Sequence, residues 1–454
     1  EELSSAVESW GACTVSRVVG DPYDGVISSS LGMVEGSLAT RGTEPFTHIL
    51  AKIPFTRPVS PWKSGSMLLR SPDGKILPFQ PFSSLQTLWF TLFFAQPGSG
   101  KSFAMNANHL GLCLNPGATR FPKIAIIDKG FSSLGLIDIL KYNLPPNKRH
   151  LVLHKKIQNT INESINICDT QLCCRTPSKI EKSFIINFLS LLATDLTEIK
   201  PAPSVINVIQ AAVDIAYYEK SDKRQPNIYT ATPQLEKVTK CIESFRHNPK
   251  FAKHPFWDRY DNNKIPIWEV VDFLFETGSI LEASYAQRYA VPKIHDIISA
   301  INSERIMSIY GDVINPTTQE PVPKMVSRLL NEAIDIFPCI RAETRIDFSN
   351  ASVIALDLQD VSQGKDPRGL RETAGMYMLA RYIMAKDFYI NEETVRDSVP
   401  AVFSQDMPIE FHKHIPKQAI VEYHSKRAKD IYEIPKRICF DEFHITAGIK
   451  PIHD

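Results

Sequence analysis

The feature that most constrains this chain is a short glycine-bearing loop between a strand-like and a helix-like stretch. Residues 95–102 have the sequence Ala-Gln-Pro-Gly-Ser-Gly-Lys-Ser. The apolar, aromatic-rich run 88–94 precedes this loop and has the length of a buried strand, and the helix-compatible run 103–110 follows it. A turn between a strand and a helix N-terminus directs backbone N–H groups and the helix dipole towards an anion. The sequence therefore predicts a phosphate-binding loop.

The side chains of this loop indicate which phosphate compound it would bind. Lys101 has the position of the lysine that reaches the β- and γ-phosphates, and Ser102 that of the hydroxyl that ligates Mg²⁺. Ala95 replaces the first glycine of the usual signature, which leaves Gly98 and Gly100 to form the tight backbone. We therefore expect ATP and Mg²⁺ as cofactors. The predicted nucleotide-binding residues are Gly98, Ser99, Gly100, Lys101, Ser102 and Phe103.

A second motif lies near the end of the chain. Residues 437–442, Arg-Ile-Cys-Phe-Asp-Glu, follow a break at Pro435. An apolar strand that ends in Asp-Glu completes the site of ATPases with an extra carboxylate: Asp441 would hold Mg²⁺ through water, and Glu442 would orient or deprotonate the attacking water. The alternative is that Asp441 caps the next helix and Glu442 is solvated. We predict Glu442 and Lys101 as catalytic residues, and Ser102 and Asp441 as metal ligands.

The string Asp-Glu-Phe-His at 441–444 also fits a helicase box. We set that interpretation aside because no Ser-Ala-Thr motif follows and such helicases do not usually carry a large insertion. Lys101 and Asp441 lie 340 positions apart (441 minus 101), far more than one α/β half-domain needs. A helical domain interpolated between the two motifs would account for the excess.

Length and composition bound the class of protein. A chain of 454 residues exceeds what one core usually holds, so two or three domains are expected. With 51 Lys+Arg against 50 Asp+Glu, overall charge gives no argument for nucleic-acid binding. No segment approaches the roughly 20 apolar residues that cross a bilayer. The chain begins at Glu1 without a methionine or signal peptide, so we expect a trimmed N-terminus.

The eight cysteines are scattered along the chain. Cys168, Cys173 and Cys174 lie close together, but a second pair at zinc spacing is missing. A metal site is therefore the weaker interpretation of this group. Buried free thiols in a reducing cytoplasm are the expected state.

The order of sequence patterns predicts the organisation of the chain. Continuous apolar runs typical of buried parallel strands occur at 123–128 and 352–358, and a shorter one at 151–153. Turn residues at 71–74 predict a hairpin, and the period changes to 3.6 between about 178 and 340. The expected domains are the end of a β-containing N-terminal domain (1–75), the first part of an α/β core with the phosphate loop (76–177), an all-helical insertion (178–343), and the C-terminally incomplete second part of the core (344–454).

Several of these segments together resemble the cytoplasmic ATPases of type IV secretion and conjugation systems, and most closely the type IVB (Dot/Icm) branch. The resemblance covers roughly residues 70–454. It is carried by the phosphate loop at 95–102, Ile-Ile-Asp-Lys-Gly at 126–130, Asp-Thr-Gln-Leu-Cys-Cys-Arg at 169–175, Arg-Glu-Thr-Ala-Gly-Met-Tyr-Met-Leu-Ala-Arg at 371–381 and Asp-Glu-Phe-His at 441–444.

The resemblance implies an α/β fold, with a RecA-like P-loop ATPase core, a large all-helical insertion and the end of a mixed N-terminal domain. It implies a homo-oligomer, either a hexamer or a hexamer of dimers, at the cytoplasmic face of the inner membrane. The implied partners are a second, traffic-type ATPase and the inner-membrane secretion complex. Nothing in the sequence is a strong sign of direct nucleic-acid binding.

Two further sites have alternatives that the sequence leaves open. Ring ATPases take an arginine from a neighbouring subunit to stabilise transition-state charge. Arg371, with Arg368, is our candidate for that catalytic role, and a solvated helix N-terminus is the alternative. Asp128 either supports the magnesium site or the phosphate loop, or is a turn residue at a strand end.

Three functions are compatible with these patterns. The first is an ATPase that powers assembly or substrate transfer in a secretion machine. The second is a conjugative DNA-translocating motor, which predicts a basic pore loop; only modest clusters such as 148–150 occur, and salt-dependent DNA binding would distinguish it. The third is a nucleotide-gated docking ring for a second ATPase.

Overall fold

The computed structural model divides the chain into two units, which are described separately. The first comprises Glu1–Lys63 and Leu68–Pro78, and the second comprises Ser64–Met67 and Phe79–Asp454. The residues described are 2–9, 14–15, 21–29, 45–48, 60–71, 74–96, 98–115, 120–194, 201–222, 224–262, 264–316, 318–346, 348, 351–361, 367–391, 395 and 417–441.

The described part of the first unit holds two short helices, α1 (Glu2–Glu8) and α2 (Pro22–Ser29). Strands β1 (Met67–Arg70) and β2 (Ile76–Phe79) pair in a two-stranded sheet, which confirms the hairpin predicted around 71–74. The amide N–H of Gly74 donates to the carbonyl of Ser71 at 2.9 Å. Gly74 has a φ of 86°, a left-handed conformation that favours glycine.

The second unit is built on a four-stranded parallel sheet, with the strand order β4-β5-β3-β6. Its strands are β3 (Lys123–Asp128), β4 (Val152–Lys156), β5 (Val353–Asp357) and β6 (Lys436–Phe440). Parallel pairing aligns Asp128 with Asp357 and Ile127 with Phe440. The mixed α/β class and the strands predicted from the apolar runs at 123–128, 151–153 and 352–358 are thus confirmed.

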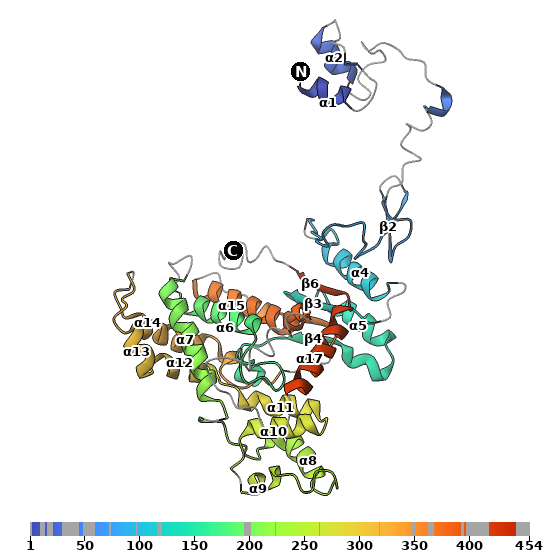
Figure 1. Ribbon diagram of the computed structural model, residues 1–454. Helices are drawn as coiled ribbons and strands as arrows, with labels where there is room; N and C mark the ends of the chain where they lie inside the picture. The colour runs from blue at the N-terminus through green and yellow to red at the C-terminus, as the bar shows by residue number, and fades with distance from the viewer. Residues whose placement is uncertain are drawn as a thin grey trace. The chain divides into compact units, whose positions relative to one another are not determined.

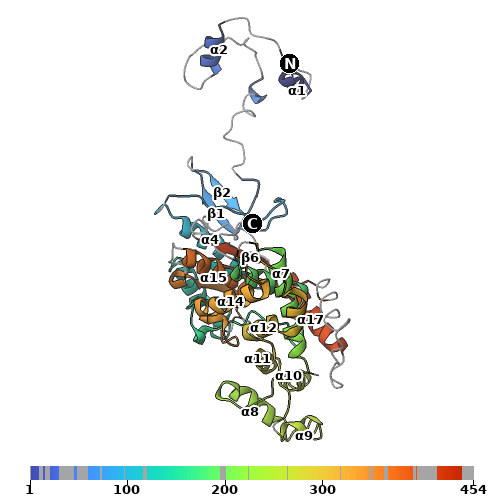
Figure 2. The same cartoon turned by 90° about the vertical axis from the view of Figure 1, so that its left-hand side faces the viewer.

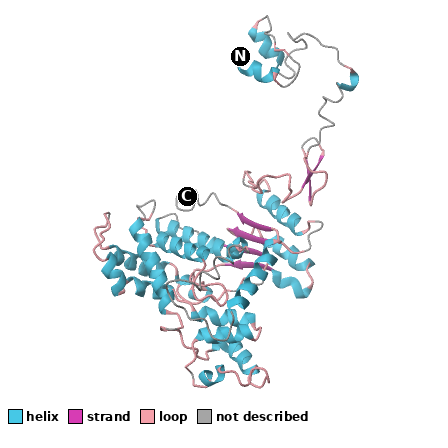
Figure 3. Cartoon of the chain, viewed as in Figure 1, coloured by secondary structure: helices cyan, strands magenta, loops and turns pink. Residues whose placement is uncertain are grey.

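Helices cover both faces of this sheet (Figure 3). Ile124 and Ile126 of β3 pack in one apolar cluster with α4 (Lys101–Cys113) and α5 (Leu134–Asn143). Ala125 and Ile127 point to the other face, into a cluster that includes α15 (Pro367–Ala385). Successive side chains of a strand face opposite sides. A strand buried on both faces is therefore expected to be apolar along its middle, as β3 is from Ile124 to Ile127, whereas Lys123 and the buried Asp128 stand at its two ends.

The strand predicted over 88–94 is wrong. These residues have no regular secondary structure, and Leu88, Phe90 and Phe94 are 79%, 75% and 87% exposed. Residues 89–95 instead line a cavity of about 740 Å³ together with β6, which is an edge strand of the described sheet. Aromatic residues favour strands through packing against neighbours, not through the backbone alone. Within the described sheet β6 pairs only with β3, so no ladder hydrogen bonds hold the run 88–94 as a strand.

Most of the described residues between 178 and 343 lie in helices, as the 3.6-residue period predicted. Ser178 begins the first helix with a capping box. Its hydroxyl accepts from the Glu181 amide, and the Glu181 carboxylate accepts from the Ser178 amide. The helices are α6 (Lys179–Leu192), α7 (Pro203–Glu219), α8 (Glu236–Ser244), α9 (Phe256–Tyr260), α10 (Ile267–Glu276), α11 (Ile280–Ala290), α12 (Ile294–Ile301), α13 (Glu304–Tyr310) and α14 (Val322–Ile336).

These helices belong to two apolar cores. Buried residues of α6, α7, α12 and α14 join the cluster on the sheet face that α15 also covers. Helices α8 to α11 gather separately in both views (Figure 1 and Figure 2), and form another cluster with α17 (Lys417–Tyr432) and the loop around Cys173. Short 3₁₀ turns connect the elements: η2 (Pro146–Leu151), η3 (Ile161–Glu163), η4 (Pro233–Leu235), η5 (Pro338–Ile340), η6 (Gln359–Val361) and η7 (Lys386–Tyr389).

Among the described residues, the structure contains no helix with both the length and the apolarity that a membrane span requires.

A buried ion-pair network fastens the loop at 169–175 to the second helical core. The Arg175 guanidinium, 5% exposed, donates to both carboxylate oxygens of Asp272 at 2.8 and 2.6 Å, and its Nε donates to Asp222 at 3.2 Å. It also lies 4.7 Å from the centre of the Trp268 ring. The neighbouring carboxylates raise the pKa of Arg175 further above its ordinary value, against the opposing effect of burial.

We predict that Arg175→Met lowers the free energy of unfolding by about 3–5 kcal/mol, because it leaves buried carboxylates uncompensated. Arg175→Lys should recover only part of this loss, since an ammonium cannot form the two parallel bonds. Urea denaturation followed by tryptophan fluorescence measures both. Arg328→Met is the matched control, because Arg328 pairs with two carboxylates but is 46% exposed. Equal losses for the buried and the exposed arginine would contradict the prediction.

Candidate functional site

The predicted phosphate loop has the backbone conformation that its glycines allow. Gly98 and Gly100 have φ values of 81° and 93°, and a Cβ added at either position would meet nothing within 4 Å. Backbone conformation, not crowding, therefore requires glycine there. Gly100 precedes α4, whose N-terminus has no side-chain cap. A helix N-terminus of this kind presents backbone N–H groups to an anion, and the binding of a phosphate here stays a prediction. Pro97 lies outside the described residues.

Asp441 meets the start of α4 although 340 positions separate it from Lys101 (441 minus 101). Its Oδ1 lies 3.2 Å from the Lys101 Nζ, and its Oδ2 accepts from the Ser102 hydroxyl at 3.2 Å. The Asp441 amide donates to the Ile127 carbonyl at 2.9 Å, which continues the β3–β6 ladder by one residue. The register of two parallel strands therefore fixes the 2%-exposed carboxylate of Asp441 beside the loop.

A second carboxylate, Asp128, joins this cluster through a serine. The Ser132 Oγ lies 2.7 Å from the Asp128 Oδ2 and 2.9 Å from the Asp441 Oδ2. One hydroxyl proton cannot serve two acceptors at once. The Ser133 amide also donates to the Asp128 Oδ2 at 2.9 Å, whereas the buried Asp128 Oδ1 has no hydrogen-bond partner among the described residues. Asp128 therefore has one carboxylate oxygen without a donor among the described residues, while Asp441 is paired with Lys101.

This oxygen cluster fits a magnesium ion bound together with a phosphate. Two cis ligands of an octahedral Mg²⁺ at about 2.0–2.1 Å lie about 3 Å apart, which is close to the 3.2 Å between the Ser102 Oγ and the Asp441 Oδ2. Among the described residues, no group of three or more His, Cys, Asp or Glu side chains could hold a metal by itself. Mg²⁺ in nucleotide sites needs only one or two protein oxygens, because phosphates and water supply the others.

Contacts between α4 and β6 hold the residues of this cluster in place. Arg437 of β6 donates to the carbonyl and side-chain oxygens of Asn108 at 3.1 and 3.0 Å, and lies 3.4 Å from the Nδ1 of His109. Burial, and then the Arg437 charge, lower the pKa of His109 to about 3, although Asp441 acts in the opposite direction. His109 is therefore neutral near pH 7, as expected for a structural histidine. Asn106 similarly ties α4 to the carbonyl of Ser132 at 2.7 Å.

The other predicted site residues are placed differently. Phe103 is 80% exposed on α4. Arg371 lies on α15, where its Nη2 donates to the Thr194 carbonyl at 2.5 Å, and its role in a neighbouring subunit stays a prediction. Glu442 and the side chain of Arg368 lie outside the described residues, so their predicted roles also stay predictions.

Ser132 was not predicted from the sequence as a member of the site. A signal was present: residues 128–133, Asp-Lys-Gly-Phe-Ser-Ser, combine turn residues between a buried strand and a helix. Gly130 has a φ of 113° within this turn, and its amide donates to the Asp357 carboxylate at 2.8 Å. The turn thus places Ser132 between the carboxyl ends of neighbouring strands.

Among solved structures, the chain has a distant likeness to a VirB4 protein. The structure of VirB4 of Thermoanaerobacter pseudethanolicus is similar to this chain with a TM-score of 0.43 and 14% sequence identity, over 86% of this chain and 80% of that one. No protein-family model matches, and no curated protein matches by sequence. At this TM-score and sequence identity the likeness carries no argument about function, which rests on the geometry of the site and on the residues of the chain.

We predict that Ser132→Ala weakens the binding of ATP in the presence of Mg²⁺ by about tenfold, because Asp441 and Asp128 lose the hydroxyl between them. Binding in the presence of EDTA should change little, which separates positioning of the carboxylates from a general loss of structure. A fluorescent ATP analogue titrated with each variant measures both affinities.

Ser133→Ala is the matched control, because the buried Ser133 hydroxyl has no partner among the described residues while its amide keeps the bond to Asp128. If the two alanine variants bind magnesium nucleotide equally well, Ser132 has no positioning role.

Proposed function

We propose that this chain is a P-loop ATPase of a type IV secretion system, of the type IVB (Dot/Icm-like) branch and similar to DotO (IcmB). In this proposal, the parallel sheet is a RecA-like core and residues 178–343 are its all-helical insertion. The observation that carries the ATPase assignment is the meeting of Lys101 and Ser102 with the Asp441 carboxylate, at 3.2 Å in each case. The resemblance of the segments at 169–175 and 371–381 supports the secretion branch.

The residues of the site have distinct proposed tasks. The N–H groups from Gly98 to Ser102 bind the phosphates, and the Lys101 ammonium moves from Asp441 to the β- and γ-phosphates. Ser102 and Asp441 hold Mg²⁺, directly or through water. When bound, this ion neutralises charge that develops on the phosphates. Ser132 orients Asp441 towards it.

Two proposed tasks concern the water molecule and the neighbouring subunit. Glu442 orients the attacking water or accepts its proton. Arg371 supplies a cation to the nucleotide of an adjacent copy. This second task requires a ring, either a hexamer or a hexamer of dimers. We propose that the ring works at the cytoplasmic face of the inner membrane, with the secretion complex and a second, traffic-type ATPase, and couples hydrolysis to machine assembly or substrate translocation.

We expect Lys101→Ala to abolish ATP binding and hydrolysis, because it removes the cation that contacts the phosphates. Glu442→Gln should preserve binding but lower kcat by about 10²–10⁴-fold, the usual contribution of a general base. Nucleotide titration and steady-state phosphate release measure the two effects. Glu433→Gln is the matched control, since Glu433 is 70% exposed and its contact with Arg120 is long, at 3.8 Å.

The same pair of variants tests whether hydrolysis is needed at all. Secretion that survives Glu442→Gln but fails with Lys101→Ala would favour a ring that uses bound nucleotide only as a switch for docking its partner. Secretion lost with both supports the energy-transducing ATPase.

A further inference from the structure

A second cavity lies at the end of the parallel sheet opposite to the predicted phosphate loop. Lys123, which begins β3, and Ser352, which precedes β5, both line it, whereas Asp128 and Asp441 lie at the other strand ends. Its volume of about 360 Å³ is within the range of small-molecule sites, about 300–1,000 Å³.

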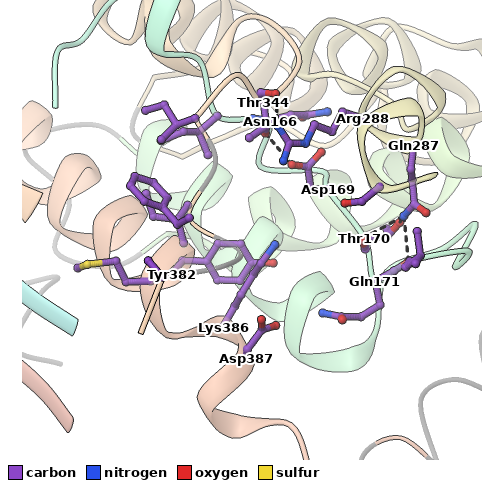
Figure 4. Close-up of a pocket in the computed structure, with 18 of the residues that line it drawn as sticks. Asn166, Asp169, Thr170, Gln171, Gln287, Arg288, Thr344, Tyr382, Lys386 and Asp387 are labelled. Atoms are coloured by element: carbon purple, nitrogen blue, oxygen red, sulfur yellow. Dashed lines mark hydrogen bonds between the residues drawn. The ribbon is translucent and has the colours of Figure 1, made fainter. Parts of the chain in front are cut away.

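Two groups of elements form the walls of this cavity. Tyr382, Lys386 and Asp387 come from the end of α15 and from η7, and Arg427 comes from α17. The loop 165–172 and α11 provide residues of the facing wall, including Asp169 and Arg288 (Figure 4). A molecule bound here would therefore contact the helical region and the sheet-covering helix α15 at the same time.

Three buried polar atoms around this cavity lack hydrogen-bond partners among the described residues. They are the Oδ1 of Asp169, the hydroxyl of Tyr382 and the Oδ1 of Asp387. The other oxygens of the two carboxylates are engaged, because Thr344 donates to Asp169 at 2.6 Å and Arg427 pairs with Asp387. A buried polar group without a partner destabilises a fold. Such groups are few in native proteins, so three around one cavity point to a ligand.

The charged side chains that line the cavity indicate the sign of the charge on that ligand. Four cationic side chains, Lys123, Arg288, Lys386 and Arg427, face two anionic ones, Asp169 and Asp387. Lys386 forms no ion pair within 4.0 Å with another described residue, and its Nζ lies 6.0 Å from the Tyr382 ring centre. Burial lowers the pKa of Lys123, more than the Asp387 charge raises it. The surplus of two positive charges matches a phosphate monoester, which carries about −1.5 to −2 at pH 7.

We propose that this cavity is a binding site for a hydroxylated phosphate monoester, either a nucleoside monophosphate or a sugar phosphate. The phosphate group pairs with Lys386 and Lys123. The hydroxyl groups of the ligand donate to the unpartnered oxygens of Asp169 and Asp387, and the Tyr382 hydroxyl forms the remaining hydrogen bond. The site is separate from the predicted ATP site and exists whether or not that site hydrolyses ATP.

Packing against a neighbouring ring fixes the position of the Tyr382 side chain. It stacks on Phe184 of α6, with ring centres 3.6 Å apart and parallel planes. Phenylalanine at position 382 would keep that stacking and remove only the hydroxyl. Tyr382→Phe therefore tests the hydrogen bond without opening a cavity in the core.

The test uses the full chain with Lys101→Ala, so that the phosphate loop does not contribute to the signal. Adenosine 5′-monophosphate and ribose 5-phosphate are titrated separately by calorimetry. We expect saturable binding of at least one of them, weakened about tenfold by Lys386→Met and by Tyr382→Phe. Matched controls are Lys426→Met and Tyr432→Phe, which are exposed on α17 and do not line the cavity. They should bind as tightly as the parent chain.

The two probes distinguish the source of the shared chemistry. Binding of adenosine 5′-monophosphate alone identifies a nucleoside site, and binding of ribose 5-phosphate identifies a sugar-phosphate site. The proposal is overturned if neither probe binds at millimolar concentration, or if both cavity variants bind as tightly as the controls. Because the proposed ATPase function is tested at Lys101 and Glu442, either proposal can fail without the other.

Discussion

The pairing of β6 with β3 is the constraint on which the rest of this structure depends. It delivers Asp441 to the start of α4 by backbone register, so that the carboxylate reaches Lys101 and Ser102 across 340 positions of sequence. Arg437 of the same strand then contacts the body of α4 through Asn108. The position of the acidic group thus depends on main-chain hydrogen bonds and on the half-buried guanidinium of Arg437.

The sequence was most informative where one local pattern decides the structure. Continuous apolar runs predicted β3 and β5 almost residue for residue, since a strand covered on both faces is apolar along its middle and has its polar residues at the ends. The helices between 178 and 343 followed from their period in the same way. The run at 88–94 has as strong a local pattern, but it does not pair with the edge strand β6, and the pattern of a single segment does not report whether its backbone pairs.

The candidate site shows the same division between local and distant information. The glycine conformations at 98 and 100 and the place of Asp441 at a strand end were foreseeable from motifs. Ser132 was not, because its contact with Asp441 joins residues 309 positions apart and depends on how two strand ends align. The cavity lined by Asp169 and Lys386 is likewise assembled from segments that carry no shared signal along the chain.

The shared apolar core has a consequence for how such a chain could be dissected. Buried residues of α7, α12 and α14 lie in one cluster with Ala125, Ile127 and Leu356 of the sheet. These helices therefore cover the interior of the sheet itself, whereas α8 to α11 have a cluster of their own. Excising α7, α12 and α14 would expose a broad apolar surface of the sheet to water.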